Sequence, residues 1–187
     1  MRIYVLVGHP DRDSFNTALA DAYCAAAAAN GHEIRRHDLA DLSFDPILHR
    51  GYKLIQPLEP DLVAAQENLS WCEHWVIFYP VWWGNAPALL KGYFDRALTP
   101  GFAFRYHDND PFWDKLLTGR SAHVVTTSDA PDLFLRFAYR NGDIDAVKRA
   151  TLEFCGFAPV KVTRISPMRY FDDNKRRHWL ERIAALA

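Results

Sequence analysis

The sequence predicts an α/β fold in which one parallel β-sheet carries helices on both of its faces. Short apolar segments of strand type alternate with helical segments along the whole chain. Strands joined through helices pair in parallel, and their helices cover the two faces of the sheet. The 187 residues contain no repeat and no linker-like stretch, so we expect a single domain over residues 1–187.

The first part of the chain predicts two strands around one helix. Ile3–Val7 is a continuous apolar run, which is typical of a strand buried on both faces. Ser14 can cap the next helix, and Asn30-Gly31 ends it because glycine tolerates a left-handed conformation. Glu33–Asp38 predicts a second strand, and its paired arginines indicate an edge position. Leu39–Pro60 has no regular period, so we expect a long functional or ligand-facing loop there.

The rest of the chain continues the alternation. It predicts three further strands: His74–Tyr79, Ser121–Thr127 and Val160–Ile165. It also predicts four helices, one opened by Pro87 and one closed by Gly156: Asp61–Leu69, Ala88–Leu98, Asp145–Cys155 and Asp172–Ala185. The aromatic stretch Pro100–Trp113 is expected to be irregular, and Ser128–Pro131 is expected to be a polar turn.

Composition and charge narrow the possible functions. The 22 basic residues balance 23 acidic ones, so charge gives no reason to expect nucleic acid as a partner. The N-terminal apolar run is too short for a signal peptide, and no run reaches the ~18–20 residues of a membrane span. We therefore expect a cytoplasmic protein with no membrane insertion. The three cysteines lie far apart and predict neither a disulfide framework nor a metal site.

Three loops are candidates for a ligand site. They follow the first, third and fourth predicted strands and are Gly8–Asn16, Pro80–Asn85 and Thr126–Asp129. In an open α/β sheet such loops meet where the order of the strands reverses, and ligands bind there.

The first loop has the chemistry of an anion site. His9 precedes Ser14, Asn16 and Thr17 at the start of a helix, where free N–H groups and the helix dipole favour a phosphate. The loop has neither the GxGxxG nor the Walker A pattern, which argues against a dinucleotide-binding Rossmann domain and an NTPase. In the alternative interpretation, Ser14 only caps the helix.

The second and third loops can form the walls of a flat pocket. Trp82 and Trp83 can stand on two sides of a tricyclic ring, and Gly84 allows close approach of the backbone. An equally weighted interpretation places one tryptophan in the core and the other at a subunit contact. The sequence from Thr126 to Asp129 offers hydroxyl and amide groups to a polar ring edge, although it is also typical of an ordinary turn.

Several motifs together resemble the flavodoxin-like NAD(P)H:quinone oxidoreductases. His9-Pro10 with Ser14-Phe15-Asn16 is similar to the phosphate loop of this family. The stretch from Tyr79 to Arg96, with its two tryptophans and its proline-to-lysine helix, resembles the loop that holds the flavin ring and the helix after it. Supporting matches are Phe44-Asp45-Pro46, Gly101–Phe104, Thr126-Thr127 and Cys155-Gly156-Phe157.

The resemblance implies a flavodoxin-like five-stranded sheet of order 2-1-3-4-5 and a tightly bound flavin. FMN is expected, with FAD as the alternative, because the compact chain leaves few segments for an adenine pocket. NAD(P)H is the implied co-substrate, and quinones or similar small molecules are the implied acceptors. A homodimer with the active site at its interface is also implied. Residues that match the family's flavin contacts are His9, Ser14, Phe15, Asn16 and Thr17 at the phosphate, Pro80, Val81, Trp82, Trp83 and Gly84 along the ring, and Thr127, Ser128 and Asp129 at its far edge.

The sequence also departs from the family pattern. Ser128-Asp129 stand where the family has two glycines, and Trp82 stands where it has glutamine. No side chain is needed as a general acid, so none is expected to be catalytic. Two other functions remain open: a flavodoxin-type electron carrier, whose usual acidity a net charge of −1 does not match, and an accessory flavoprotein subunit of a membrane transporter.

Overall fold

The computed structural model describes residues 1–187 and confirms the predicted parallel sheet. The strands of this sheet are β1 (Arg2–Val7), β2 (Glu33–Asp38), β3 (His74–Pro80), β6 (Ser121–Thr127) and β7 (Val160–Ile165). They lie in the order β2-β1-β3-β6-β7, and each neighbouring pair is parallel. Counted among the parallel strands, this is the order 2-1-3-4-5 that the family resemblance implies. The arginine-rich strand β2 lies at an edge, as predicted.

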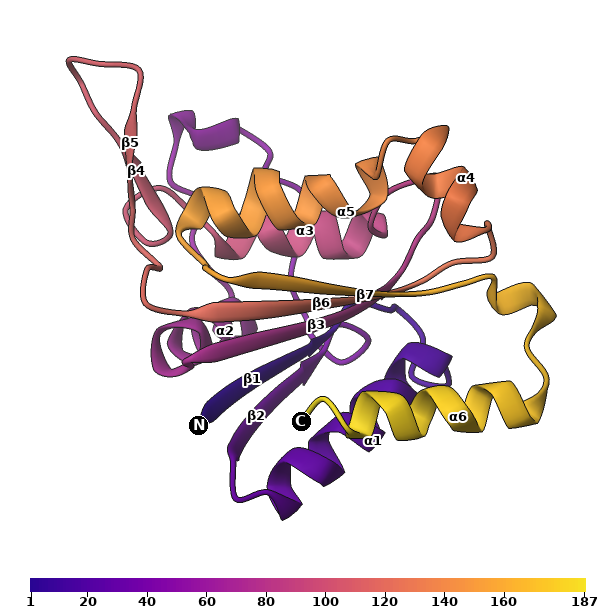
Figure 1. The fold of residues 1–187 in the computed structure, drawn as a ribbon. Coiled ribbons are helices and arrows are strands. Elements are labelled where there is room, and N and C mark those ends of the chain that lie inside the picture. The colour runs from indigo at the N-terminus through magenta and orange to yellow at the C-terminus, as the bar shows by residue number, and fades with distance from the viewer.

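Helices cover both faces of the sheet (Figure 1). One face packs against α1 (Phe15–Ala29) and α6 (Asp173–Ala184). The other packs against α2 (Pro60–Trp71), α3 (Ala88–Ala97) and α5 (Gly142–Val147), and the last of these continues as a π-helical segment over Lys148–Glu153. The side chains of β1 alternate between two apolar cores, because successive residues of a strand point to opposite faces.

Two segments differ from the expectations drawn from the sequence. The stretch Pro100–Trp113 is not wholly irregular, since β4 (Phe104–Tyr106) pairs antiparallel with β5 (Trp113–Lys115). This hairpin projects beyond the sheet in Figure 1. The polar turn after β6 leads directly into a helix that the sequence did not predict, α4 (Asp132–Phe137). The chain has no helix that is both long enough and apolar enough to cross a membrane.

The long loop between β2 and α2 is fixed to α3 by a buried arginine. The Arg96 side chain is 1% exposed, and it donates to the main-chain oxygens of Asp45 and Pro57 and to the carboxylate of Glu59 at 2.8 Å. The loop contains one short 3-10 turn, Gly51–Lys53. It therefore packs against α3 instead of lying open.

Gly92 of α3 lies against the same loop, and this contact gives a stability prediction. A Cβ atom at position 92 would lie 2.6 Å from the main-chain oxygen of Pro46 and 2.4 Å from its Cβ. We expect Gly92→Ala to lower the free energy of unfolding by about 1–3 kcal/mol, because the loop must move to relieve the overlap. Chemical denaturation measures the change. Gly142→Ala, where the added Cβ meets no atom within 4 Å, is the control and should cost much less.

Candidate functional site

A cavity of about 330 Å³ opens where β1, β3 and β6 end. Because these strands are parallel neighbours, the loops that follow them meet at one edge of the sheet, where open α/β folds bind ligands. The lining residues come from four connections: His9, Asp11, Ser14, Phe15, Asn16, Pro80, Val81, Trp82, Thr127, Ser128, Asp129 and Met168.

Most of the side chains selected from the sequence surround this cavity. Ten of the thirteen line it, and the other three, Thr17, Trp83 and Gly84, do not. Thr17 is half-buried, and its hydroxyl lies 2.9 Å from the Ser14 hydroxyl. The three loops therefore converge as predicted, but the cavity uses fewer residues of the first two loops than expected.

The first loop presents neutral and backbone donors. Ser14 caps α1 by accepting the Thr17 N–H at 3.2 Å, so the cap that the sequence predicts is present. The Asp11 N–H donates to His9 Nδ1 at 2.9 Å. Nδ1 also lies 3.1 Å from the Asp11 main-chain oxygen, and in the tautomer in which it accepts from the Asp11 N–H, the ring proton is on Nε2. Together with the unpaired N–H groups of the first helical turn, this proton makes the loop suitable for an anion.

Asn16 connects the first loop to the third. Its Nδ2 donates to Thr127 Oγ1 at 3.0 Å, and the side chain is 3% exposed. Its Oδ1 is buried and has no hydrogen-bond partner in the protein. Such an atom is costly to leave unpaired. Because Asn16 also lines the cavity, its amide is a candidate contact for a polar ligand.

The tryptophan turn is tight and separates its two rings. Trp82 and Asn85 exchange main-chain hydrogen bonds of 2.8 and 3.0 Å around Trp83 and Gly84, which have φ values of 52° and 68°. Positive φ at both central residues is typical of a type I′ turn. Trp82 packs edge-on against His9 and lines the cavity, whereas the Trp83 side chain is fully exposed. In the single chain, only the Trp82 ring of the two therefore lines this cavity.

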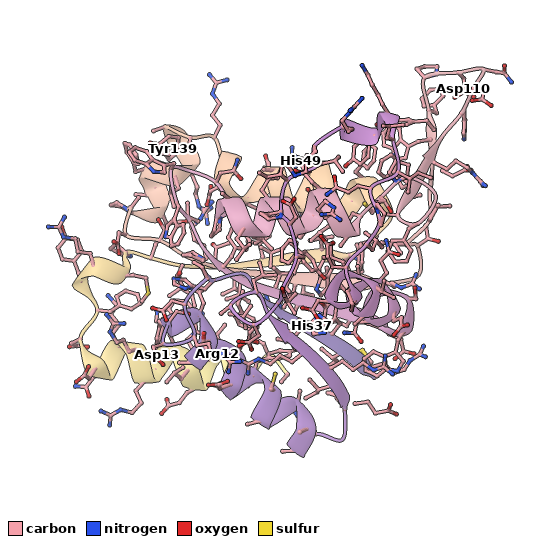
Figure 2. All side chains as sticks on the ribbon, turned by 180° about the vertical axis from the view of Figure 1, so that it is seen from behind. Arg12, Asp13, His37, His49, Asp110 and Tyr139 are labelled. Carbon is pink, nitrogen blue, oxygen red and sulfur yellow. The ribbon has the colours of Figure 1, made fainter.

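Tyr139 lies against the outer side of this turn. A Cβ atom at Gly84 would meet the Tyr139 ring at 3.5 Å. The labelled side chains in Figure 2 place Tyr139 at the opposite end of the molecule from Asp110 in the β4–β5 hairpin. Tyr139, in the segment that follows α4, therefore packs against the tryptophan turn at Gly84.

A buried ion pair holds the segment that carries Tyr139. Arg164 of β7 contacts both carboxylate oxygens of Asp143 at 3.0 Å and also reaches Asp132 Oδ1 at 2.5 Å. The Asp143 side chain is 0% exposed and that of Arg164 is 6% exposed. The Tyr79 hydroxyl donates to the main-chain oxygen of Asp143 at 2.9 Å. Helices α4 and α5 are thereby tied to two strands beside the cavity.

Asp11 and Met168 line the cavity but were not selected from the sequence. Asp11 belongs to the polar loop His9–Asp13, from which only His9 was selected as a site residue. Selecting all polar residues of that loop would have found it. Met168 follows β7, and its N–H donates to the Ser128 oxygen at 2.8 Å. Because β7 neighbours β6, the connection after β7 also reaches this edge of the sheet.

Comparison with known proteins identifies the fold family. A family model described by its flavodoxin-like fold matches residues 1–186. The chain belongs to the flavodoxin-like fold family. This membership agrees with the observed strand order and with the position of the cavity at the carboxyl ends of the strands.

Several known proteins are similar to this chain over most of its length. NAD(P)H dehydrogenase (quinone) 1 from Rattus norvegicus is 28% identical, and the match covers 83% of this chain and 65% of the relative. The chain thus spans slightly less than two thirds of that protein. An uncharacterized NAD(P)H oxidoreductase from Haemophilus influenzae is 24% identical, with 98% of this chain and 93% of the relative covered. The structure of NAD(P)H:quinone oxidoreductase from Methanothermobacter marburgensis has a TM-score of 0.81 and 25% identity, over 99% of this chain and 94% of that one.

Proposed function

We propose that the chain is a flavin-dependent oxidoreductase that passes hydride from NAD(P)H to quinones or similar small electron acceptors. The observation that carries the proposal is the cavity itself, where three loops of different chemistry converge at the carboxyl edge of the sheet. The relatives support the class of reaction, because their names describe NAD(P)H dehydrogenases and quinone oxidoreductases.

The residues of the first loop fit the phosphate end of a flavin. Ser14, Phe15 and Asn16 stand at the start of α1, where main-chain N–H groups and the helix dipole favour an anion. The Asn16 amide can turn over without a change of shape. Its oxygen then accepts from the Thr127 hydroxyl, and its NH₂ group becomes a donor for the phosphate. His9 lies at the same end and can add a ring N–H donor.

The other two loops fit the ring. Pro80, Val81 and Trp82 offer an apolar wall, and Thr127, Ser128 and Asp129 offer a polar edge. When bound, the flavin supplies the hydride chemistry, which no side chain can provide. The protein contributes orientation and exclusion of water. We assign no catalytic acid or base.

We propose FMN as the cofactor, with FAD as the alternative. The compact chain leaves few segments that could form an adenine pocket, which favours the smaller flavin. Mass spectrometry of the flavin released from the purified protein distinguishes the two.

We further propose a homodimer, located in the cytoplasm, with the site at the subunit interface. Exposed apolar side chains lie on the tryptophan turn and on α4 beside the cavity: Trp83, Leu133, Phe134, Phe137 and Tyr139. Clusters of this kind commonly mark contact surfaces. Light scattering on the FMN-saturated protein tests the dimer, and a monomeric mass would contradict it.

Steady-state oxidation of NADH and NADPH with menadione tests the enzymatic function. Turnover that depends on bound flavin and on the acceptor supports the proposal. Flavin binding without turnover would favour an electron carrier, and stable co-purification with a membrane protein would favour a transporter subunit.

Asp129 gives a redox prediction for this site. Its carboxylate lines the cavity at the edge proposed for the flavin ring, so it opposes negative charge added to the ring. We expect Asp129→Asn to raise the midpoint potential of the bound flavin by about 20 mV, equivalent to ~1 kcal/mol for a two-electron couple. Spectroelectrochemical titration measures the shift. Asp110→Asn in the distant hairpin is the control. Equal flavin midpoint potentials for the wild-type protein, Asp129→Asn and Asp110→Asn would contradict the role of Asp129.

A further inference from the structure

A second cavity lies at the opposite end of the sheet, where the strands begin. Its volume is about 270 Å³, several times the ~30 Å³ that a water molecule occupies. Figure 1 shows the amino end of the chain on this side, away from α4. The lining residues are Met1, Tyr23, His74, Ser121, Ala122, His123, Pro159, Lys161, Leu186 and Ala187. None of them takes part in the site proposed for the flavin.

Three basic side chains share one face of the sheet at this cavity. His123 of β6 is the direct neighbour of Lys161 of β7, and His74 of β3 is the direct neighbour of Ser121. Ser121 and His123 are two residues apart on one strand, so their side chains point to the same face. Neighbouring strands lie ~4.8 Å apart, which brings the two imidazoles and the lysine into one cluster.

The hydrogen-bonding capacity of the cluster is only partly used. His74 Nδ1 lies 2.7 Å from the Ser121 hydroxyl, and His123 Nε2 lies 2.8 Å from the Thr163 hydroxyl. The second nitrogen of each ring has no partner in the protein. Lys161 forms none of the ion pairs of the chain.

Tyr23 of α1 adds a phenolic donor at the cavity wall. Its side chain is 3% exposed and lines the cavity, but its hydroxyl makes no hydrogen bond within the protein. The groups left free around the cavity are thus an ammonium, a phenol and imidazoles. An ammonium and a phenol are hydrogen-bond donors, and an imidazole donates from both of its nitrogens when it is protonated. A ligand rich in hydrogen-bond acceptors therefore matches these groups.

No carboxylate side chain lines the cavity, and the one acidic group at its rim is the backbone carboxyl group of Ala187. Glu73, which precedes His74, is turned toward Arg2, and its oxygen accepts the Arg2 N–H at 2.9 Å. The amine of Met1 contacts His32 at 3.2 Å, and the main-chain oxygen of Ala187 accepts from Asn30 at 3.0 Å. The charged and polar groups at the rim therefore already have partners outside the cluster.

We propose that the cavity formed by Tyr23, His74, His123 and Lys161 is a binding site for a small oxyanion. The environment of the histidines agrees with this assignment. Burial, together with repulsion from His74 and Lys161, lowers the pKa of His123 to about 4, and burial together with repulsion from Lys161 also lowers the pKa of His74. An anion relieves this repulsion and stabilises the protonated rings. Affinity therefore rises as the pH falls and the rings take up protons.

Sulfate is the probe for the test, because its charge stays constant while the histidines titrate. Imidazole resonances are followed by NMR on the FMN-saturated protein, at constant ionic strength maintained with sodium chloride. We expect sulfate to raise the pKa of His74 and His123 and to leave the exposed His178 unchanged. Because the pKa of His123 is about 4 and that of His74 is also lowered, sulfate binding at pH 4.5 should be tighter than at pH 7.5 by up to about fivefold, the factor expected for one partly exposed ion pair.

Two conservative variants test the assignment of donors. Lys161→Gln and Tyr23→Phe should each weaken sulfate binding several-fold, while Lys53→Gln, which lies outside the cavity, should not. Loss of the sulfate response in the first two variants, with unchanged far-UV circular dichroism, supports the site. A response confined to His9, equal shifts at His178, or no response at all would overturn it. None of these outcomes depends on whether the chain is an oxidoreductase.

Discussion

Replacing Arg164 by methionine is expected to lower the free energy of unfolding by about 3–5 kcal/mol. The substitution leaves the carboxylate of Asp143, which is 0% exposed, without its guanidinium partner. An uncompensated buried charge costs far more than the pair itself contributes. Urea denaturation of the flavin-free protein measures the loss. The effect should also reach the cavity, because the same pair fixes the segment that places Tyr139 against Gly84.

Two further variants separate burial from charge. Arg136 also pairs with Asp132, at 2.7 Å, but its side chain is 59% exposed. Arg136→Met should therefore cost less than about 1 kcal/mol. Adding Asp143→Asn to Arg164→Met should recover part of the lost stability, because the unpaired charge is removed. Similar losses for Arg136→Met and Arg164→Met would contradict the account.

Replacing Asn16 by leucine is expected to weaken flavin binding by at least about tenfold, since a hydrogen bond to a charged group contributes ~1.5–3 kcal/mol. The substitution keeps the approximate size of the side chain. It removes the link between Asn16 and Thr127 and the free amide group at the cavity. Quenching of flavin fluorescence measures the dissociation constant directly.

Asn68→Leu is the matched control for this prediction. Asn68 is also a buried asparagine, but it lies on α2 and contacts two residues of the edge strand β2, Arg35 at 3.2 Å and His37 at 3.3 Å. It does not line the cavity. It should lower stability without changing the flavin dissociation constant. Equal loss of affinity in both variants would show that Asn16 acts only through general stability.

The sheet was predictable because its signal is local. The central strands β1, β3 and β6 are short and mainly apolar runs next to a cap or a turn, and the pattern around Ser14 or Asn30 needs no knowledge of distant residues. The convergence of the three loops then follows from topology alone. For this reason ten of the thirteen selected side chains line one cavity.

The missed elements lack such a local signal. The hairpin strands span three residues each, too few for a period to be recognised. In α4 only Leu135 is buried, while Leu133, Phe134 and Phe137 are exposed, so the helix shows no apolar face toward the core. Trp83 points outward because two consecutive positive φ values reverse the chain there, and non-glycine residues rarely adopt that conformation.

The ion pair between Arg164 and Asp143 was equally invisible in the sequence. Its partners are 21 residues apart, on a strand and on a helix of which the sequence predicted only the later part. Charged residues in a strand or near a helix start are more often solvated than buried. Only the packing of α5 against β7 shows that these two are enclosed.

Anaerobic stopped-flow spectroscopy tests the central claim most directly. FMN-saturated protein is mixed first with NADH or NADPH, and then with menadione, while the visible flavin absorbance is recorded. The account predicts rapid loss of the absorbance with at least one nucleotide and its rapid return with the quinone, and both steps should be impaired in Asn16→Leu at equal FMN concentration. Protein that binds no flavin, or a bound flavin that responds to neither nucleotide, would contradict the account.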